Sequence, residues 1–366
     1  MVHTDALVIG AGPVGLFQVF QLGLLGLKAE VVDVLPEAGG QCAALYPDKP
    51  IYDVPGVPLC TGRELTQLLL TQARPFMAAE APGTLPRNLH LGQLVRELRA
   101  QPEGGFDVLT DKGLAFHCRA VFVAAGAGAF VPKTLNLPGI DTATNVHYHH
   151  DTTAEANGVP APWAGQHLVI AGGGDEALSA VIDLAHASAA QRPARLTLLH
   201  RRDQFQAEAA LDTQVRGLIA AGRVELTVGL PNATVVDASQ PGKLTALNLL
   251  GPDGQTRDLP LDHLLIRHGM SPKLGPLSQW GLTLERKQVA VSAASFESQV
   301  RGIYAVGDIN TYPGKKRLLL CGFHEATLAA HHAAAELNPD APQHLLYTTT
   351  SPLLHQRLGV SGASSG

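Results

Sequence analysis

Short apolar runs alternate with glycine turns and helical spacing along this chain of 366 residues. The first apolar run, residues 5–10, leads into a glycine turn and a helix-like stretch, and a second run follows at residues 29–34. The same order returns at residues 167–174 and 195–199, again with helical spacing between the two runs. A strand, a helix and a second strand in this order indicate a βαβ unit. We therefore predict two such units, each within a parallel sheet.

Two further segments decide how the domains are arranged. Residues 121–132 predict a strand that leaves one domain through glycine and proline, and residues 302–309 predict a late strand before an alanine-rich helix that starts near His324. We expect the late strand to return to the first domain, which makes that domain discontinuous. The predicted boundaries are 1–119 and 290–350 for the first domain, 120–289 for the inserted domain and 351–366 for a C-terminal extension.

Composition excludes several classes of protein. A hydrophobic content of 45%, 38 glycines and 16% charged residues exclude a disordered or coiled-coil chain. A formal net charge of -5 gives no overall attraction to nucleic acid or to an anionic membrane. The four cysteines, Cys42, Cys60, Cys118 and Cys321, show neither a Cys-x-x-Cys pair nor a dense disulfide framework, so we expect a cytoplasmic protein.

The first glycine turn has the sequence Gly10-Ala11-Gly12-Pro13-Val14-Gly15, between a predicted strand and a predicted helix. In such a turn the second glycine lets a pyrophosphate approach the backbone, and the third lets the helix pack closely on the sheet. The following helix N-terminus attracts the phosphate charge. Asp33 ends the next strand, where a carboxylate accepts hydrogen bonds from a ribose. The predicted dinucleotide-binding residues here are Gly10, Gly12, Pro13, Val14, Gly15 and Asp33.

The second glycine turn, Gly172-Gly173-Gly174-Asp175-Glu176-Ala177, is followed by a different kind of strand end. Instead of an acid, the segment His200-Arg201-Arg202 closes this unit. A guanidinium at this place grips a ribose 2′-phosphate, which a carboxylate would repel, so the cofactor is predicted to be NADPH. The predicted binding residues are Gly172, Gly174, Asp175, Ala177, His200, Arg201 and Arg202.

One βαβ unit ends in an acid and the other ends in arginine, which indicates two different dinucleotides. The late segment Ala305-Val306-Gly307-Asp308 suits FAD in the first site, because Asp308 can hold a hydroxyl of the ribityl chain. We therefore predict an α/β fold with two Rossmann-like FAD/NAD(P)-binding domains, the second inserted into the first. FAD is expected in the discontinuous domain, with Gly307 and Asp308 in its site.

Further motifs carry a resemblance to a known family. The segments Gly39-Gly40-Gln41, Ala44 to Lys49 and Ile51 to Gly56 are followed in order by GGGDEA, LLHRRDQF, VGDINTYPGK and GFHEA. Over nearly its whole length the chain resembles the ferredoxin–NADP reductases of the thioredoxin-reductase-like type. The resemblance implies a homodimer that binds FAD and NADPH. It also implies FAD contacts at Asp33, Gly40, Gln41, Tyr46, Val95, Phe130, Asp308 and Thr349.

The same resemblance implies the catalytic residues. Tyr46 is expected to stack on one face of the flavin and Tyr347 on the other, with Thr349 near the reactive nitrogen. Hydride transfer needs no side-chain acid, so catalysis is expected to rest on stacking and orientation. Two positions depart from the family pattern: Gln206 stands where arginine is common, and His324 stands where glycine is usual.

Other functions remain as alternatives. A thioredoxin reductase needs a Cys-x-x-Cys dithiol, which residues 144–148 lack, although Cys42 leaves another kind of disulfide reductase open. A non-catalytic NADP sensor is also consistent with two dinucleotide folds. The histidines His147, His149 and His150 with Asp151 lack the spacing of a mononuclear site, so we predict no metal.

A basic run directly follows the predicted flavin motif. Lys315, Lys316 and Arg317 are expected to lie near the cofactor, where they could steer an acidic carrier, ferredoxin or flavodoxin, despite the net charge of -5. Two alternatives stay open: the run is a solvated turn, or Lys315 supports local structure.

Overall fold

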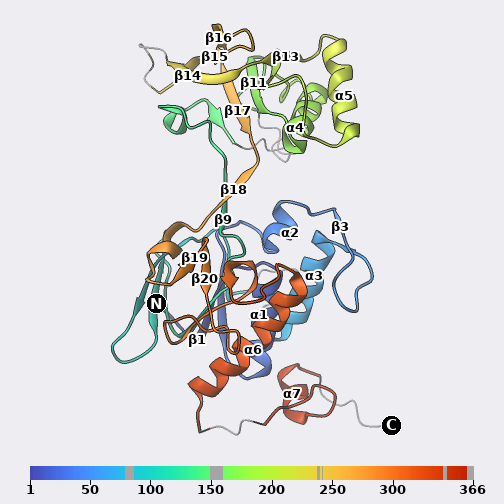
Figure 1. Ribbon diagram of the computed structural model, residues 1–366. Helices are drawn as coiled ribbons and strands as arrows, with labels where there is room; N and C mark the ends of the chain where they lie inside the picture. Colours follow the sequence, from blue (N-terminus) through green and yellow to red (C-terminus); the bar gives the residue numbers. More distant parts are fainter. Residues whose placement is uncertain (79–85, 149–159, 237–239, 241, 341–343, 361–366) are drawn as a thin grey trace. The chain divides into compact units, whose positions relative to one another are not determined.

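The computed structural model describes the chain except residues 79–85, 149–159, 237–239, 241, 341–343 and 361–366 (Figure 1). It divides into two compact units: residues 1–129 with 272–366 form unit 1, and residues 130–271 form unit 2. The insertion therefore begins ten residues later than the predicted residue 120, and it ends before the predicted residue 289. Two connecting strands that pair with each other lead into and out of unit 2: β9 (Ala129–Pro132) and β18 (Met270–Lys273).

Unit 1 is built on a mostly parallel sheet with the strand order β5-β2-β1-β8-β7-β6. Strands β1, β2, β5 and β8 run parallel, whereas β6 and β7 form an antiparallel extension. The sheet strands are β1 (Val2–Ile9), β2 (Ala29–Val32), β5 (Leu89–His90), β6 (Val95–Ala100), β7 (Phe106–Thr110), β8 (Ala115–Val123) and β21 (Ile303–Ala305).

Strand β8 explains why the first boundary lies where it does. Its pairing with β1 runs from Phe116 to Val123, so the apolar residues Val121 and Val123 belong to the sheet of unit 1 rather than to the insertion. Its first half also pairs with β7, and its last three residues pair with the late strand β21. Residues beyond 290 thus complete a sheet that residues before 124 began.

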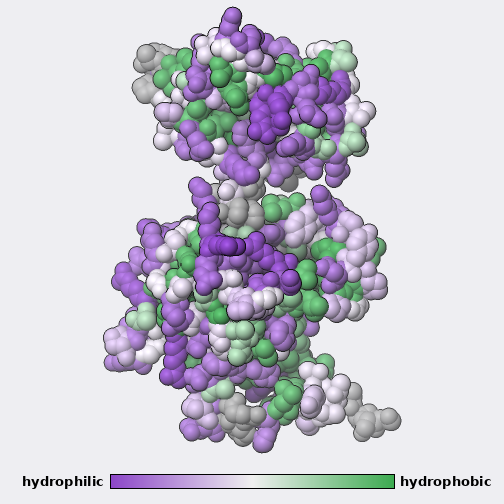
Figure 2. All heavy atoms as spheres, in the orientation of Figure 1, coloured by the Kyte–Doolittle hydropathy of each residue, from purple (hydrophilic) through white to green (hydrophobic). Residues whose placement is uncertain are grey.

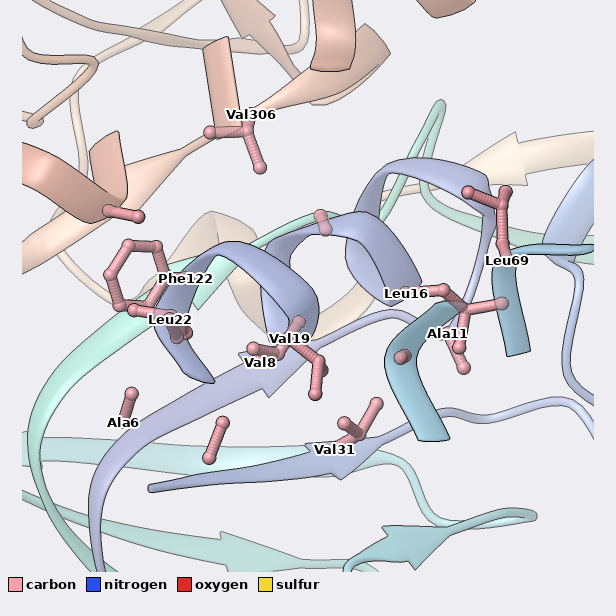
Figure 3. Packing of buried hydrophobic residues seen from close by; sticks show 14 of the residues in the cluster. Ala6, Val8, Ala11, Leu16, Val19, Leu22, Val31, Leu69, Phe122 and Val306 are labelled. Carbon is pink, nitrogen blue, oxygen red and sulfur yellow. The ribbon is translucent and has the colours of Figure 1, made fainter. Parts of the chain in front are cut away.

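The core of unit 1 lies where helix α1 (Pro13–Leu24) packs against this sheet. Leu16, Val19 and Leu22 point from the helix toward Val8 on β1 and Phe122 on β8 (Figure 3). The spacing of three residues between these leucine and valine side chains places them on one helical face. The other helices of unit 1 are α2 (Gly40–Ala44), α3 (Gly62–Ala73), α6 (Leu319–Leu337) and α7 (Pro352–Arg357).

Short strands complete unit 1 between its larger elements. On the side where the chain returns from the insertion, β20 pairs with β22 and Leu277 joins the buried core, which explains why residues 272–289 belong to unit 1. The short strands are β3 (Pro50–Ile51), β4 (Cys60–Thr61), β19 (Leu284–Glu285), β20 (Gln288–Ala290) and β22 (Asn310–Thr311).

Unit 2 repeats the design on a smaller scale. A parallel sheet with the order β10-β17-β11-β12-β13 packs against helices α4 (Asp175–His186) and α5 (Ala209–Ala220), and a three-stranded antiparallel sheet covers another part. Its strands are β10 (Val146–His147), β11 (His167–Gly172), β12 (Arg195–His200), β13 (Glu225–Val228), β14 (Leu230–Val236), β15 (Leu244–Leu250), β16 (Thr256–Pro260) and β17 (His263–Arg267).

The visible faces of the two units are mostly hydrophilic, with hydrophobic residues in scattered patches (Figure 2). Among the described helices, none combines the length and the hydrophobicity needed to span a membrane.

Candidate functional site

The first glycine turn forms an open cradle at the start of α1. Gly10 has a φ of +114°, and a Cβ there would lie 2.4 Å from the carbonyl oxygen of Ala124. Gly12 faces Gly40, and a Cβ on Gly40 would lie 2.9 Å from the Gly12 Cα. No side chain of the described chain caps α1, so its first backbone N–H groups are available to an anion. The cradle therefore fits a dinucleotide pyrophosphate.

Asp33 fixes the backbone beside this cradle. Its carboxylate accepts hydrogen bonds from Ala11 N at 2.6 Å and from Leu35 N at 2.8 Å. Burial raises the pKa of Asp33, and the bonds from Leu35 and Ala11 oppose that rise. The structure thus brings Asp33 into direct contact with the glycine turn.

Tyr46 lies beside Cys42 and within electrostatic reach of Asp308, a residue of the predicted flavin site. The Cys42 thiol donates to the Tyr46 hydroxyl at 3.5 Å. Burial is the main cause that raises the pKa of Tyr46, followed by Cys42 and then by the Asp308 carboxylate. Residues from two distant segments therefore share one environment. Gln41 precedes Cys42 in α2, and a Cβ on Gly126 would lie 3.1 Å from its Nε2 atom.

The start of α6 packs directly on this region. A Cβ on Gly322 would lie 2.5 Å from Val14 Cγ2 and 3.4 Å from the Cα of Gly307. The first turn of α1, the Gly307 turn and α6 therefore meet at one place. Unit 1 thus brings together the predicted FAD residues Gly10, Gly12, Pro13, Val14, Gly15, Asp33, Gly40, Gln41, Tyr46, Gly307 and Asp308.

Within one chain, Tyr347 and Thr349 lie apart from these predicted FAD residues. Tyr347 is 63% exposed, in a segment that turns into α7. Arg357 anchors α7 by donating to the carbonyl of Leu24, at the far end of α1 from the glycine turn (Figure 1). Since a helix rises about 1.5 Å per residue, the 12 residues of α1 separate these ends by about 18 Å.

Two other predicted FAD contacts have different surroundings. Val95 is 3% exposed, with its side chain in the hydrophobic core. Phe130 belongs to β9, and its side chain lies outside the described part of the structure.

Unit 2 presents its own glycine turn at the end of β11. A Cβ on Gly172 would lie 2.7 Å from the Cβ of Ala177, so the start of α4 packs tightly on the strand. Gly174 is the N-cap of α4, and no side chain in the described residues caps this helix. Asp175 accepts a hydrogen bond from Glu208 N at 2.8 Å and so positions the loop that follows β12.

His200, Arg201 and Arg202 lie at the same sheet edge, because β11 and β12 are adjacent and parallel. Burial is the first cause that lowers the pKa of His200, and the cations Arg201 and Arg202 add to it. Its Nε2 atom is buried with no partner among the described residues. At Gln206, the departure from the family pattern, the backbone N donates to Gly173 O at 2.8 Å.

Arg267 is a member of this site that the sequence did not suggest. It ends β17, directly beside Gly172 on β11. One guanidinium nitrogen donates to Tyr148 O at 3.0 Å, whereas Nε is buried and has no partner in the described chain. Nearby, the pKa of His268 is lowered by burial first and then by His200, Lys133 and Arg201. This concentration of positive charge fits a phosphate-bearing ligand.

Two of the described histidines lie side by side in unit 2. His147 Nε2 lies 2.9 Å from His263 Nδ1, and its ring packs edge-on against Trp163. No group of three potential ligands exists among the described residues. His149, His150 and Asp151 lie outside them.

Comparison with known proteins decides the family. The family model for pyridine nucleotide-disulphide oxidoreductases matches residues 87–336. A ferredoxin–NADP reductase of Paracidovorax citrulli (strain AAC00-1) is 51% identical, with 100% of this chain and 98% of the relative covered. Another from Acidovorax sp. (strain JS42) is 49% identical over 98% of this chain and 96% of the relative. The chain belongs to the ferredoxin–NADP reductase family.

A solved structure shows the fold of this ferredoxin–NADP reductase family member independently. The thioredoxin reductase of T. acidophilum matches with a TM-score of 0.56 at 19% identity, covering 92% of this chain and 99% of that one. The predicted pair of Rossmann-like domains and the resemblance stated from the motifs are both confirmed.

Unlike a dithiol reductase, this ferredoxin–NADP reductase family member has no cysteine pair: all four cysteines are free. Burial raises the pKa of Cys42 and of Cys60. Because the thiolate is the reactive form of cysteine, buried thiols of this kind are poor nucleophiles. The raised pKa gives no support to the Cys42 alternative.

Proposed function

We propose that this protein is an FAD-dependent ferredoxin–NADP reductase, which transfers electrons between NADPH and a one-electron protein carrier, ferredoxin or flavodoxin. The observation that carries the proposal is the pair of separate dinucleotide cradles, one beside Tyr46 and Asp308 and one beside a cluster of cations, in a chain without a cysteine pair. When bound, FAD supplies the chemistry that links hydride transfer to single-electron transfer.

In unit 1, each residue has a task that follows from its position. The uncapped first turn of α1, from Pro13 through Gly15, would bind the FAD pyrophosphate, and Asp33 would hold the turn and the ribose. Tyr46 would stack on the flavin, since its hydroxyl is already held by Cys42. Orientation of the reacting groups is then the main contribution of the protein.

In unit 2, Arg201 and Arg202 would bind the 2′-phosphate of NADPH. Both are exposed directly after β12, and a guanidinium can bind two phosphate oxygens at once. The buried, unpartnered Nε of Arg267 would gain an acceptor from the same ligand.

The direct test is a reductase assay with the FAD-loaded protein. We expect a yellow protein whose flavin absorbance is bleached faster by NADPH than by NADH, and which reduces ferredoxin at the expense of NADPH. Absence of bound flavin, or turnover with a disulfide substrate instead of ferredoxin, would overturn the proposal. A protein that binds both cofactors without turnover would support the NADP-sensor alternative.

A homodimer would explain the position of Tyr347 and Thr349. Within one chain they lie at the far end of α1 from the flavin cradle, and Leu345, Leu346 and Tyr347 are 42–63% exposed. We propose that this segment reaches the FAD of a second copy, where Tyr347 would cover the other flavin face and Thr349 would lie near the reacting nitrogen. The four free cysteines suit a cytoplasmic enzyme.

Subunit mixing tests this arrangement. Homodimers of the Tyr46→Ala variant and homodimers of the Tyr347→Ala variant should each show impaired turnover. After exchange of subunits at equal amounts, half of the dimers are mixed, and each mixed dimer contains one intact site. Activity should therefore recover to roughly a quarter of the native value. No recovery would mean that Tyr347 acts on its own chain, and native turnover by the Tyr347→Ala homodimer would mean that Tyr347 does not act at all.

A further inference from the structure

Glu325 is a fully buried carboxylate with a complete set of donors. It lies on α6 with no exposed surface. Its Oε2 atom accepts from Gly307 N at 2.7 Å and from Asn310 Nδ2 at 2.9 Å. Its Oε1 atom accepts from Tyr312 OH at 2.9 Å and from Lys315 Nζ at 2.5 Å. Because an ionised carboxylate has about four acceptor sites, this one is saturated.

Lys315 completes the arrangement from the other side of the same turn. Its side chain is 7% exposed, and its ammonium group also donates to the carbonyl of Gly307 at 2.9 Å. The two side chains therefore hold both backbone polar groups of one glycine. A buried ion pair stabilises little by itself, because removing the charges from water offsets their attraction. Such a pair is better explained by what it holds in place.

The Gly307 turn needs such support. Gly307 has a φ of +78° and follows the end of β21, where strand pairing stops. The backbone carbonyl of Asp308 is fixed by Gln288 Nε2 at 3.0 Å. In contrast, none of the described residues hydrogen-bonds the Asp308 carboxylate, which is left for a ligand.

We propose that Glu325 and Lys315 are a positioning pair for FAD: together they hold the Gly307 turn so that Asp308 faces the flavin site. The inference rests on the proposed function, because it assumes that FAD binds beside Asp308. It differs from a purely structural role in one measurable respect. A positioning pair controls FAD affinity separately from the stability of the apoprotein.

The test measures FAD binding to apoprotein by fluorescence quenching, and apoprotein stability by thermal unfolding. The variants are Glu325→Gln, Lys315→Met and the combined E325Q/K315M. Each single change leaves a buried group without its partner, so FAD Kd should rise about tenfold or more and stability should fall. In the combined variant both charges are gone, so stability should largely return while FAD Kd stays high, because Gly307 O still lacks its donor.

Asn88→Ala is the matched control. Asn88 is 7% exposed and holds the backbone of Ala29 and Phe76 at a place away from the turn, so its loss should lower stability but change FAD Kd less than about twofold. If FAD Kd follows stability across all four variants, the pair is only structural and the inference fails. If native apoprotein itself binds no FAD, the proposed function fails instead.

Discussion

Arg201 and Arg202 extend from the end of β12 as exposed cations beside the half-buried ring of His200. Replacing both with alanine should raise the KM for NADPH about 10-fold to 100-fold, since a charge-assisted hydrogen bond contributes about 1.5–3 kcal/mol. The KM for NADH should change less than about twofold, because NADH has no 2′-phosphate. Steady-state kinetics with both cofactors check this. Arg257→Ala, an exposed arginine on β16, is the control, and equal losses with NADPH and NADH would contradict the assignment.

The distance along the chain between interacting residues explains which site residues the sequence could predict. Arg201 and Arg202 follow a recognisable glycine turn at a fixed interval, so their place is set by local order along the chain. Arg267 was missed because its place depends on β17 lying beside β11, a pairing between segments about 95 residues apart in register. Lys315 shows the same limit. The sequence left open whether Lys315 was a docking cation or a support for local structure, and its buried ion pair with Glu325 favours the support.

At the scale of elements, the contact between α1 and α6 depends on a single missing side chain. Gly322→Ala would place a methyl group 2.5 Å from Val14 Cγ2. Overpacking of this kind costs about 1–3 kcal/mol, so the apoprotein should unfold at a lower temperature. Val14→Ala removes the obstructing methyl groups, so Gly322→Ala should cost much less in that background. Thermal unfolding of the two single variants and the combined variant measures this coupling. Equal costs in both backgrounds would contradict the contact.

The elements themselves could be predicted wherever an apolar run had a clear end. Strand β1, helix α1 and strand β2 follow directly from the first βαβ pattern. Helix α6 begins at Leu319 rather than near His324, and its N-cap is Leu318, which makes no capping hydrogen bond, so the sequence carries no start signal there. The insertion boundary was displaced for a related reason. Nothing in the sequence around β8 indicates that its apolar residues belong to the sheet of unit 1.

At the scale of the whole molecule, carrier docking should depend on charge. Lys316 and Arg317 remain exposed, and Arg317 donates to Gln288, which in turn holds the Asp308 backbone. An acidic carrier attracted to these cations should show a KM that rises with ionic strength, because exposed charges are screened over about 10 Å at 0.1 M salt. Lys316→Glu with Arg317→Glu should raise the carrier KM much more than it slows NADPH reduction of bound flavin.

The control reverses the same number of charges at the opposite ends of the parallel strands. Lys28 and Arg301 are exposed and precede β2 and β21, whereas the Gly307 turn follows β21. Reversal of these two cations to glutamate should leave the carrier KM and its salt dependence nearly native. A carrier KM that is independent of salt and of both double reversals would exclude the Lys316 and Arg317 surface from docking.

The pairing of strand β8 affects how the protein folds during its synthesis. Val123 on β8 pairs with Ala305 on β21, and the whole insertion is synthesised between them. At about 5–20 residues per second, the edge of β8 waits on the order of 10–40 s on the ribosome before its partner emerges. Because β9 and β18 pair at the junction, folding of unit 2 brings the two ends of this long loop together in advance. We expect the insertion to fold first during translation, so that slow folding in unit 2 leaves an unpaired strand edge in unit 1 open to aggregation.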